Sequence, residues 1–219
     1  MDMTEKKWNL IDRHQFFGSK SIVELIADQL DRPPTCGIEI GVYTGVTSMM
    51  LLRYFRELSL FMVDPYLPYS VDRSSEEHLF ARDQALFRTE CFASRRHLIV
   101  EKSSVAKAMF PQAFADFVFI DGDHSFAGVK SDLQNYTKRV RKGGIVICHD
   151  AKQGQVYKAV RNHCQVIGVP FFHGRAKSAW FFVDYGNDIE GGLVRDQFDD
   201  RLFEQSDCIS HKTQWPKPK

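Results

Sequence analysis

The chain has 219 residues, of which 43% are hydrophobic, enough for one α/β domain with a sizeable buried core. Its 29 basic and 28 acidic residues leave a net charge of +1, which gives no bulk attraction to nucleic acid or to an anionic membrane. The five cysteines form no Cys-x-x-Cys pair, and no apolar run approaches the roughly 20 residues of a membrane span. These features disfavour a zinc site, a disulfide framework and a membrane protein, and we expect a cytoplasmic location.

The predicted elements alternate between helix and strand. Helices are inferred from apolar residues that recur every three or four positions, and strands from short apolar runs. In chain order we expect a helix at residues 22–30, a strand at 36–40, a helix at 47–56, a strand at 59–63, a helix at 79–87, strands at 97–101 and 117–120, a helix at 126–140, a strand at 145–148, a helix at 156–164 and strands at 166–169 and 180–183. This alternation predicts a parallel, doubly wound α/β sheet.

Capping and stop signals refine these elements. Ser74 and Glu77 fit a capping box at the start of the helix that continues through Phe87. Gly143 and Gly144 are expected to end the helix that precedes the fifth strand.

A glycine-rich turn follows the first strand. Gly41 and Gly45 allow a tight turn and a close approach of the backbone to a ligand. Tyr43 stands where a dinucleotide fingerprint has its second glycine, so NAD binding is disfavoured. Asp64 ends the second strand, where a carboxylate can accept both hydroxyls of a ribose. Together they predict a nucleoside ligand; a turn without ligand and an Asp-Pro turn are the alternatives.

Acidic and imidazole side chains follow the fourth and fifth strands. Asp121, Asp123 and His124 come after one strand, and His149 and Asp150 after the other. Ligands of open α/β sheets bind beyond the carboxyl ends of the strands, so these side chains are expected to converge. Carboxylates this close raise one another's pKa unless a cation is present. A divalent metal or the sulfonium of S-adenosylmethionine (SAM) would serve; helix capping and hydrogen-bonded loop histidines are the alternatives.

Five short motifs occur in a recognisable order: Glu-Ile-Gly-Val-Tyr-Thr-Gly, Val-Asp-Pro, Phe-Ile-Asp-Gly-Asp-His-Ser, Lys-Gly-Gly and His-Asp-Ala. The series resembles class I SAM-dependent methyltransferases, and it is similar to the branch of small-molecule and sugar O-methyltransferases with an Asp-Gly-Asp-His-Ser signature. The resemblance covers residues 20–185. It implies a Rossmann-like, doubly wound, seven-stranded mixed sheet flanked by helices, with an antiparallel last strand.

The resemblance also implies site residues. The cofactor contacts that it implies are Glu39, Gly41, Tyr43 and Gly45 at the methionine part of SAM, Thr47 near its carboxylate, Asp64 at the ribose, Ser103 and Ser104 near the adenine, and Asp121. Asp121 and Asp150 match metal ligands of metal-dependent relatives, which often have an acidic or amide residue where this chain has His149. Either His149 joins the metal shell, which favours a transition metal over magnesium, or no metal binds and His149 handles protons.

The predicted function is SAM-dependent O-methylation of a sugar or another small metabolite. A hydroxyl is a poor nucleophile while protonated, so a metal or a general base must help; the candidate bases are Asp123, His124 and His149. The alternative is a non-catalytic regulatory subunit that binds SAM or a nucleotide. We expect a small-molecule or sugar acceptor as partner, with neither nucleic acid nor membrane, and leave a homo-oligomer open.

Two stretches depart from the alternation. Residues 65–78 carry Tyr66 and Tyr69 beside Asp64, so we expect them to form part of the acceptor pocket or a lid over it; an ordinary loop is the alternative. The polar residues 186–219 are expected to form a tail after a single domain that spans residues 1–185.

Overall fold

The computed structural model describes residues 13–67, 74–152, 154–174 and 177–184. These residues belong to the first of two units of the chain, Met1–Asn187. The predicted tail and Tyr69 lie outside the described residues, and the predicted domain limits stay predictions.

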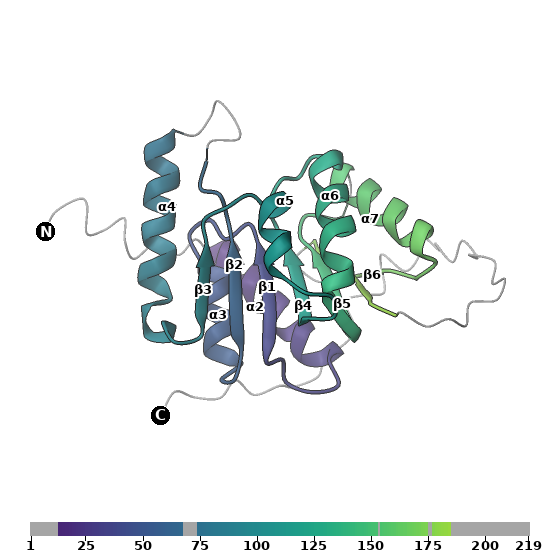
Figure 1. Cartoon of the computed structure of the whole chain (residues 1–219), viewed down its shortest axis with the longest axis horizontal. Coiled ribbons are helices and arrows are strands. Elements are labelled where there is room, and N and C mark those ends of the chain that lie inside the picture. Colours follow the sequence, from purple (N-terminus) through teal and green to yellow (C-terminus); the bar gives the residue numbers. More distant parts are fainter. Residues whose placement is uncertain (1–12, 68–73, 153, 175–176, 185–219) are drawn as a thin grey trace, which may run out of the picture. The chain divides into compact units, whose positions relative to one another are not determined.

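The described strands form one mixed sheet. They are β1 (Cys36–Ile40), β2 (Ser59–Val63), β3 (Arg96–Ile99), β4 (Ala115–Ile120), β5 (Val140–Cys148), β6 (Phe172–His173) and β7 (Ala179–Phe182), in the spatial order β3-β2-β1-β4-β5-β7-β6. The pairs among β1 to β5 are parallel, whereas β7 runs antiparallel to β5 and β6 antiparallel to β7. The predicted Rossmann-like seven-stranded mixed sheet with an antiparallel last strand is confirmed (Figure 1).

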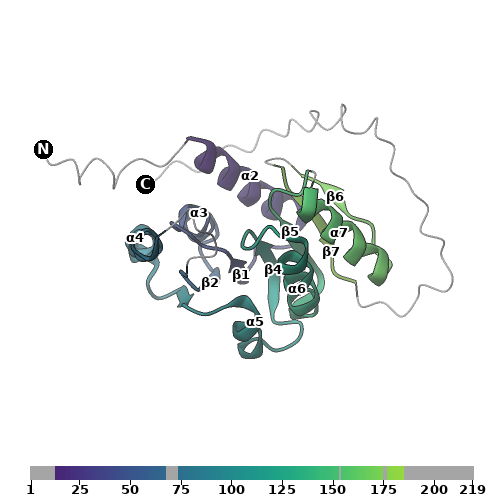
Figure 2. The ribbon, with the colours of Figure 1, turned by 90° about the horizontal axis from the view of Figure 1, so that it is seen from above.

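Helices cover both faces of this sheet. Figure 2 shows α2 (Arg13–Gln29), α3 (Val46–Tyr54) and α4 (Ser75–Arg88) on one side, and α5 (Ser103–Ala106), α6 (Phe126–Tyr136) and α7 (Gly154–Ile167) on the other. Each side has its own hydrophobic cluster, and all six residues of β4 are buried between the two. This burial explains why β4 is apolar from Phe117 to Ile120, as strands covered on both faces are.

The helix-start signals are confirmed by hydrogen bonds. Ser74 and Glu77 form a complete capping box at the start of α4. At the start of α6, the hydroxyl of Ser125 accepts a hydrogen bond from the Gly128 amide at 3.1 Å. Among the described residues, no helix is both long enough and apolar enough to cross a membrane.

The prediction that Gly143 and Gly144 end a helix was wrong. α6 ends at Tyr136, a 3-10 turn spans Thr137–Arg139, and both glycines lie inside β5. The register of β4 and β5 shifts at this point, as in a β-bulge. A Cβ on Gly144 would lie 2.4 Å from the carbonyl oxygen of Asp116, so the close approach of the two strands requires glycine.

The predicted strand at residues 166–169 was also wrong. α7 continues through Ile167 and ends before Gly168, whose φ of +73° suits the left-handed residue that follows a helix. Val166 is 77% exposed on this helix, so its apolar side chain does not indicate a buried strand. The strand lies a few residues later, as β6, and β3 begins and ends slightly earlier than predicted.

Candidate functional site

Backbone hydrogen bonds extend the sheet beyond the carboxyl ends of its parallel strands. The amide of Gly41 donates to Val63, that of Asp64 to Ile99, that of Asp121 to Ile40 and that of His149 to Ile120, at 2.8–3.1 Å. The residues that follow β1, β2, β4 and β5 therefore lie in one continuous row. The predicted convergence concerned the side chains that follow β4 and β5, and these two segments lie next to each other in this row.

The glycine turn after β1 is packed tightly on both sides. A Cβ on Gly41 would lie 2.3 Å from the carbonyl oxygen of Asp121, and one on Gly45 would lie 2.8 Å from the Cα of Ala85. Both glycines have positive φ values, +85° and +73°. Side chains would therefore strain the backbone and push the turn away from β4 and α4.

Three larger residues at this edge also adopt left-handed backbone conformations. The φ values are +49° for Tyr43, +47° for Tyr66 and +50° for Asp150, after β1, β2 and β5 respectively. Such conformations are strained for residues other than glycine and often mark functional sites. Tyr66 is buried, and the role of its loop in an acceptor pocket stays a prediction.

Asp64 shapes the turn through its carboxylate. One oxygen accepts hydrogen bonds from the amides of Val42 and Tyr43, both at 2.9 Å, and the other accepts from Tyr66 at 2.8 Å. Each carboxylate oxygen can accept about two hydrogen bonds, so one acceptor position stays available on the second oxygen. Asp64 thus supports the turn and retains limited capacity for a ribose hydroxyl.

Glu39 is buried at the end of β1, with 1% of its surface exposed. The hydroxyl of Ser48 donates to its carboxyl group at 2.5 Å. Burial raises the pKa of Glu39 to about 8, with the Ser48 hydrogen bond opposing this rise and the charges of Asp121 and Asp64 adding to it. Sequence reasoning missed Ser48; its place in the first turn of α3 was the available signal.

The other residues expected to contact the cofactor are Tyr43, Thr47, Ser103 and Ser104, and each has its own surroundings. Tyr43 is 37% exposed beside the turn. Thr47 pairs its hydroxyl with that of Ser19 in α2, at 2.8 Å. Ser103 is partly buried and Ser104 exposed, both at the start of α5. Their predicted contacts with SAM stay predictions.

Four side chains form a compact cluster at the ends of β4 and β5, here called the acid–imidazole cluster: Asp121, His124, His149 and Asp150. Asp121 Oδ1 lies 3.1 Å from His124 Nε2 and 3.1 Å from His149 Nδ1. Asp150 Oδ2 lies 3.7 Å from the Nδ1 atom of each histidine. Two acids thus share two imidazoles.

This arrangement explains the charge states. The Asp121 hydrogen bond raises the pKa of His124. Burial alone would lower the pKa of His149, but the hydrogen bond and charge of Asp121 outweigh it and leave that pKa raised. Burial likewise opposes ionisation of Asp121, yet both histidines together hold its pKa below the usual 3.8. The two imidazoles therefore offset the negative charge of the two carboxylates when they are protonated, and they do so up to a higher pH than free histidines would.

The cluster in this arrangement does not fit a metal ion. Its imidazole nitrogens lie 3.1–3.7 Å from carboxylate oxygens and pair with them. No group of three or more His, Cys, Asp or Glu side chains in the described part of the chain is placed to hold one.

Asp123 lies apart from the cluster. Its carboxylate accepts hydrogen bonds from the amide of Ser125 at 2.8 Å and from the Ser125 hydroxyl at 3.0 Å. These contacts organise the start of α6, which was the structural alternative. The assignment of Asp123 as a base stays a prediction that its contacts do not favour.

A lysine that sequence reasoning missed approaches the cluster from the loop between β6 and β7. Lys177 Nζ lies 3.9 Å from Asp150 Oδ1, and its carbonyl oxygen accepts the amide of Ala151 at 2.7 Å. No motif contains Lys177; only the antiparallel pairing of β5 with β7 brings it here.

The structure resembles several solved methyltransferases. It shares 19% identity and a TM-score of 0.58 with a TDP-rhamnose 3'-O-methyltransferase of calicheamicin biosynthesis, covering 83% of this chain and 86% of that one. A putative caffeoyl-CoA O-methyltransferase from Staphylococcus aureus is 16% identical, with a TM-score of 0.57, and the match covers 83% of this chain and 88% of that one. A putative SAM-dependent methyltransferase from Methanococcus maripaludis is 12% identical, with a TM-score of 0.61, and the match covers 82% of this chain and 90% of that one. At such identities the likeness concerns the fold.

Sequence comparison identifies the family. An uncharacterized protein of Acanthamoeba polyphaga mimivirus is 25% identical over 134 residues, which cover 59% of this chain and 57% of that protein. The chain thus spans little more than half the length of this curated relative. Residues 38–151, just over half of the chain, match the family described as "Methyltransferase domain". The chain therefore belongs to the family described as "Methyltransferase domain".

Proposed function

We propose that this chain transfers a methyl group from SAM to a hydroxyl of a sugar or another small metabolite. The observation that carries the proposal is the acid–imidazole cluster, which lies in one row with the glycine turn and Asp64. Two of the similar structures are named as O-methyltransferases, one of them acting on TDP-rhamnose, which supports oxygen as the acceptor atom.

The chemistry needs alignment and a proton acceptor. When bound, the cofactor supplies an activated methyl group. A bond then forms between the acceptor oxygen and the methyl carbon while the carbon–sulfur bond breaks, and the hydroxyl proton passes to a base. The row of strand ends would hold the nucleoside on one side and present the base on the other.

His149 is the candidate base that the contacts favour. Its Nδ1 lies 3.1 Å from Asp121 Oδ1, so Asp121 can accept a hydrogen bond from Nδ1–H and hold the tautomer in which Nε2 is free to take a proton from the acceptor. His124 differs, since its Nε2 faces Asp121 and its Nδ1 faces Asp150. A carboxylate that orients an imidazole is a recurring arrangement in general-base catalysis.

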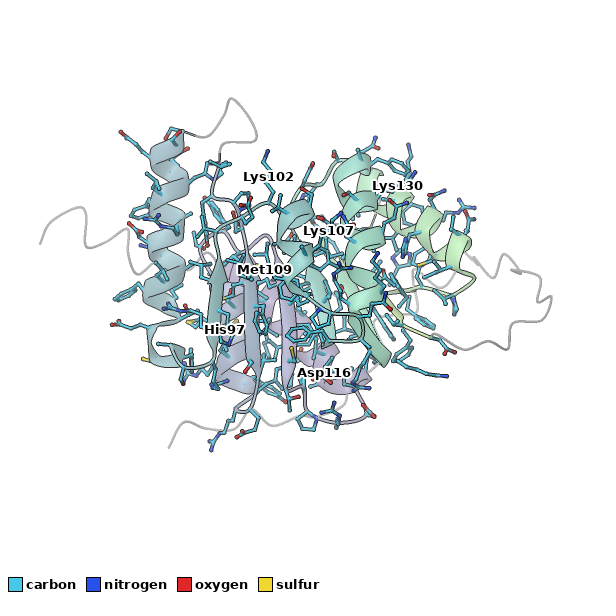
Figure 3. The ribbon with its side chains drawn as sticks, in the orientation of Figure 1. His97, Lys102, Lys107, Met109, Asp116 and Lys130 are labelled. Atoms are coloured by element: carbon cyan, nitrogen blue, oxygen red, sulfur yellow. The ribbon has the colours of Figure 1, made fainter. Side chains whose placement is uncertain are left out.

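The test is a methyl-transfer assay with sugar and phenol acceptors. His149→Ala should lower kcat by about a hundredfold or more, as loss of a general base does. His97→Ala is the matched control, because His97 is exposed near the start of β3 (Figure 3) and stacks on Phe61. Full activity of His149→Ala would remove His149 as the base.

Divalent-metal assistance is a separate proposal, which the geometry does not favour. The measurement is elemental analysis, with activity assayed before and after a chelator is added. Full activity in excess chelator would leave the general-base proposal alone, whereas its loss and recovery with magnesium or a transition ion would show that the cluster rearranges around a metal.

The non-catalytic alternative has its own signature. A regulatory subunit would bind SAM tightly and produce no methylated acceptor with any compound of the panel. The acid–imidazole cluster disfavours this reading, because paired acids and imidazoles are unnecessary for binding a nucleoside alone.

A further inference from the structure

We propose that Asp132 is a positioning residue of the cofactor site: through Ser103 it holds the segment after β3 where the adenine of SAM is expected. The inference rests on the proposed function, because the segment affects activity only if SAM binds beside it. Neither Asp132 nor its helix face carries a motif that the sequence analysis singled out.

Two side chains of α6 bind Ser103, one through its hydroxyl and the other through its carbonyl oxygen. Asp132 is 3% exposed, and its Oδ1 accepts a hydrogen bond from the Ser103 hydroxyl at 2.6 Å. Tyr136, one helical turn later and fully buried, donates its hydroxyl to the Ser103 carbonyl oxygen at 2.8 Å. Residues four apart share one face of a helix, so α6 holds both the side chain and the backbone of Ser103.

The far end of the same segment is held by α6 as well. Lys107 Nζ donates to Asn135 Oδ1 at 2.9 Å, and Arg139 Nε donates to the Lys107 carbonyl oxygen at 2.9 Å. Figure 3 labels Lys102 and Lys107, which flank α5 beside α6. The segment is thus held at both ends by α6, and at its far end also by Arg139 of the 3-10 turn that follows α6.

Ser103 and Ser104, which the sequence analysis places together near the adenine, therefore differ in their contacts. The hydroxyl of Ser103 is committed to Asp132, whereas Ser104 is exposed. Ser104 is the serine available to a ligand, and Ser103 sets its position.

The carboxylate of Asp132 is costly where it lies. Burial raises its pKa to about 6, with the Ser103 hydrogen bond opposing this and the charge of Asp123 adding to it. No Lys, Arg or His of the described residues lies within ion-pair distance of it. A buried charge without a cation destabilises a fold, so packing alone does not account for an acid at this position.

α6 also links this segment to the acid–imidazole cluster. The helix begins at Phe126, capped by Ser125, directly after His124. A shift of α6 would therefore move His124 of the cluster and the adenine side of the site together.

The test is a double-mutant cycle on the affinity for S-adenosylhomocysteine, measured by calorimetry. Asp132→Ala and Ser103→Ala should each weaken binding about tenfold, the loss expected for one hydrogen bond of ordinary strength. The double variant should also lose only about tenfold, because both changes break the same contact. KM for SAM should rise by the same factor while kcat stays within about twofold.

Asp132→Asn is the conservative variant. Its carbonyl oxygen can still accept the Ser103 hydrogen bond, so affinity should stay within about threefold of the wild type. This variant also keeps the test informative if Asp132→Ala does not fold. Asp83→Ala is the control, since Asp83 is exposed on α4 and pairs with Arg82.

Three results would overturn the inference: unchanged affinity in both Asp132→Ala and Ser103→Ala, a multiplicative loss of about a hundredfold in the double variant, or a fall in kcat at unchanged KM. Failure of the proposed function gives a different result. A wild-type chain that binds neither SAM nor S-adenosylhomocysteine would remove both.

Discussion

Strand β4 has one carboxylate near its start, Asp116, and another directly after its end, Asp121. The two differ in their hydrogen-bond partners. Asp116, near the start of β4, is 2% exposed and accepts hydrogen bonds from Arg32 and Arg141 and from the amides of Thr35 and Cys36, at 2.7–3.0 Å. Figure 3 shows it at the opposite end of the sheet from Lys102.

Asp121, directly after β4, shares one oxygen between two imidazoles that are themselves partly exposed. Asp116 has strong, fixed donors and no capacity left for a ligand. Asp121 has partners that can gain or lose a proton in the physiological range of pH. Asp116 is buried among fixed donors, whereas Asp121 is partly exposed and has titratable partners; these two differences together separate a structural acid from one that is suited to proton transfer.

The largest effect is expected from Asp121→Asn. The variant removes the charge that orients His149 and stabilises its protonated form, so kcat should fall by about a hundredfold to ten-thousandfold. The free energy of unfolding should change much less, and Asp83→Asn should behave as the wild type in both. Wild-type turnover in Asp121→Asn would show that Asp121 has no catalytic role that distinguishes it from Asp116.

Asp116→Ala should have the converse effect. It leaves two guanidinium groups and two amides without their acceptor, and it should lower the free energy of unfolding by about 3 kcal/mol. Denaturant titration measures this loss. SAM affinity, measured well below the unfolding transition, should stay unchanged; a large loss of affinity would show that this end also serves the site.

Asp64→Ala is expected to weaken cofactor binding, both through the lost carboxylate and through the turn that it supports. Loss of hydrogen bonds to a charged acceptor should weaken SAM by about tenfold to a hundredfold. Calorimetry on the variant measures the change. Unaltered affinity would show that neither the carboxylate nor the turn that it supports contributes to cofactor binding.

The smallest effect is a shift in the pH profile. Since the pKa of His149 is raised above its usual 6.5, the imidazole stays protonated to higher pH, and activity should rise with pH through an inflection above 6.5. In Asp121→Asn, the residual activity should show that inflection at lower pH, because the carboxylate no longer favours the protonated form. An inflection that does not move would assign it to another group.

Much of the fold could be predicted from the sequence because each local pattern had one physical explanation. The predicted limits of β1 and β2 agree with the structure, since short apolar runs there are bounded by polar residues and turns. Where two explanations compete, the prediction failed. Val166 is apolar yet exposed in α7, and Gly143 and Gly144 form a bulge rather than a helix stop.

The candidate site could be predicted in part. The position of a residue after a strand can be inferred from sequence, so the meeting of Asp121 with His149 was expected. The direction of a side chain cannot, which is why Asp123 turns to Ser125 and why Ser48 and Asp132 were missed. Their contacts depend on packing between α3 and β1 and between α6 and α5.

The most direct test of the account is calorimetry of the wild-type chain with SAM, S-adenosylhomocysteine and NAD in parallel. The glycine turn, Asp64 and the acid–imidazole cluster predict saturable binding of the first two and none of NAD. Binding of NAD without binding of SAM or S-adenosylhomocysteine would contradict the assignment of this edge of the sheet as a methyl-transfer site.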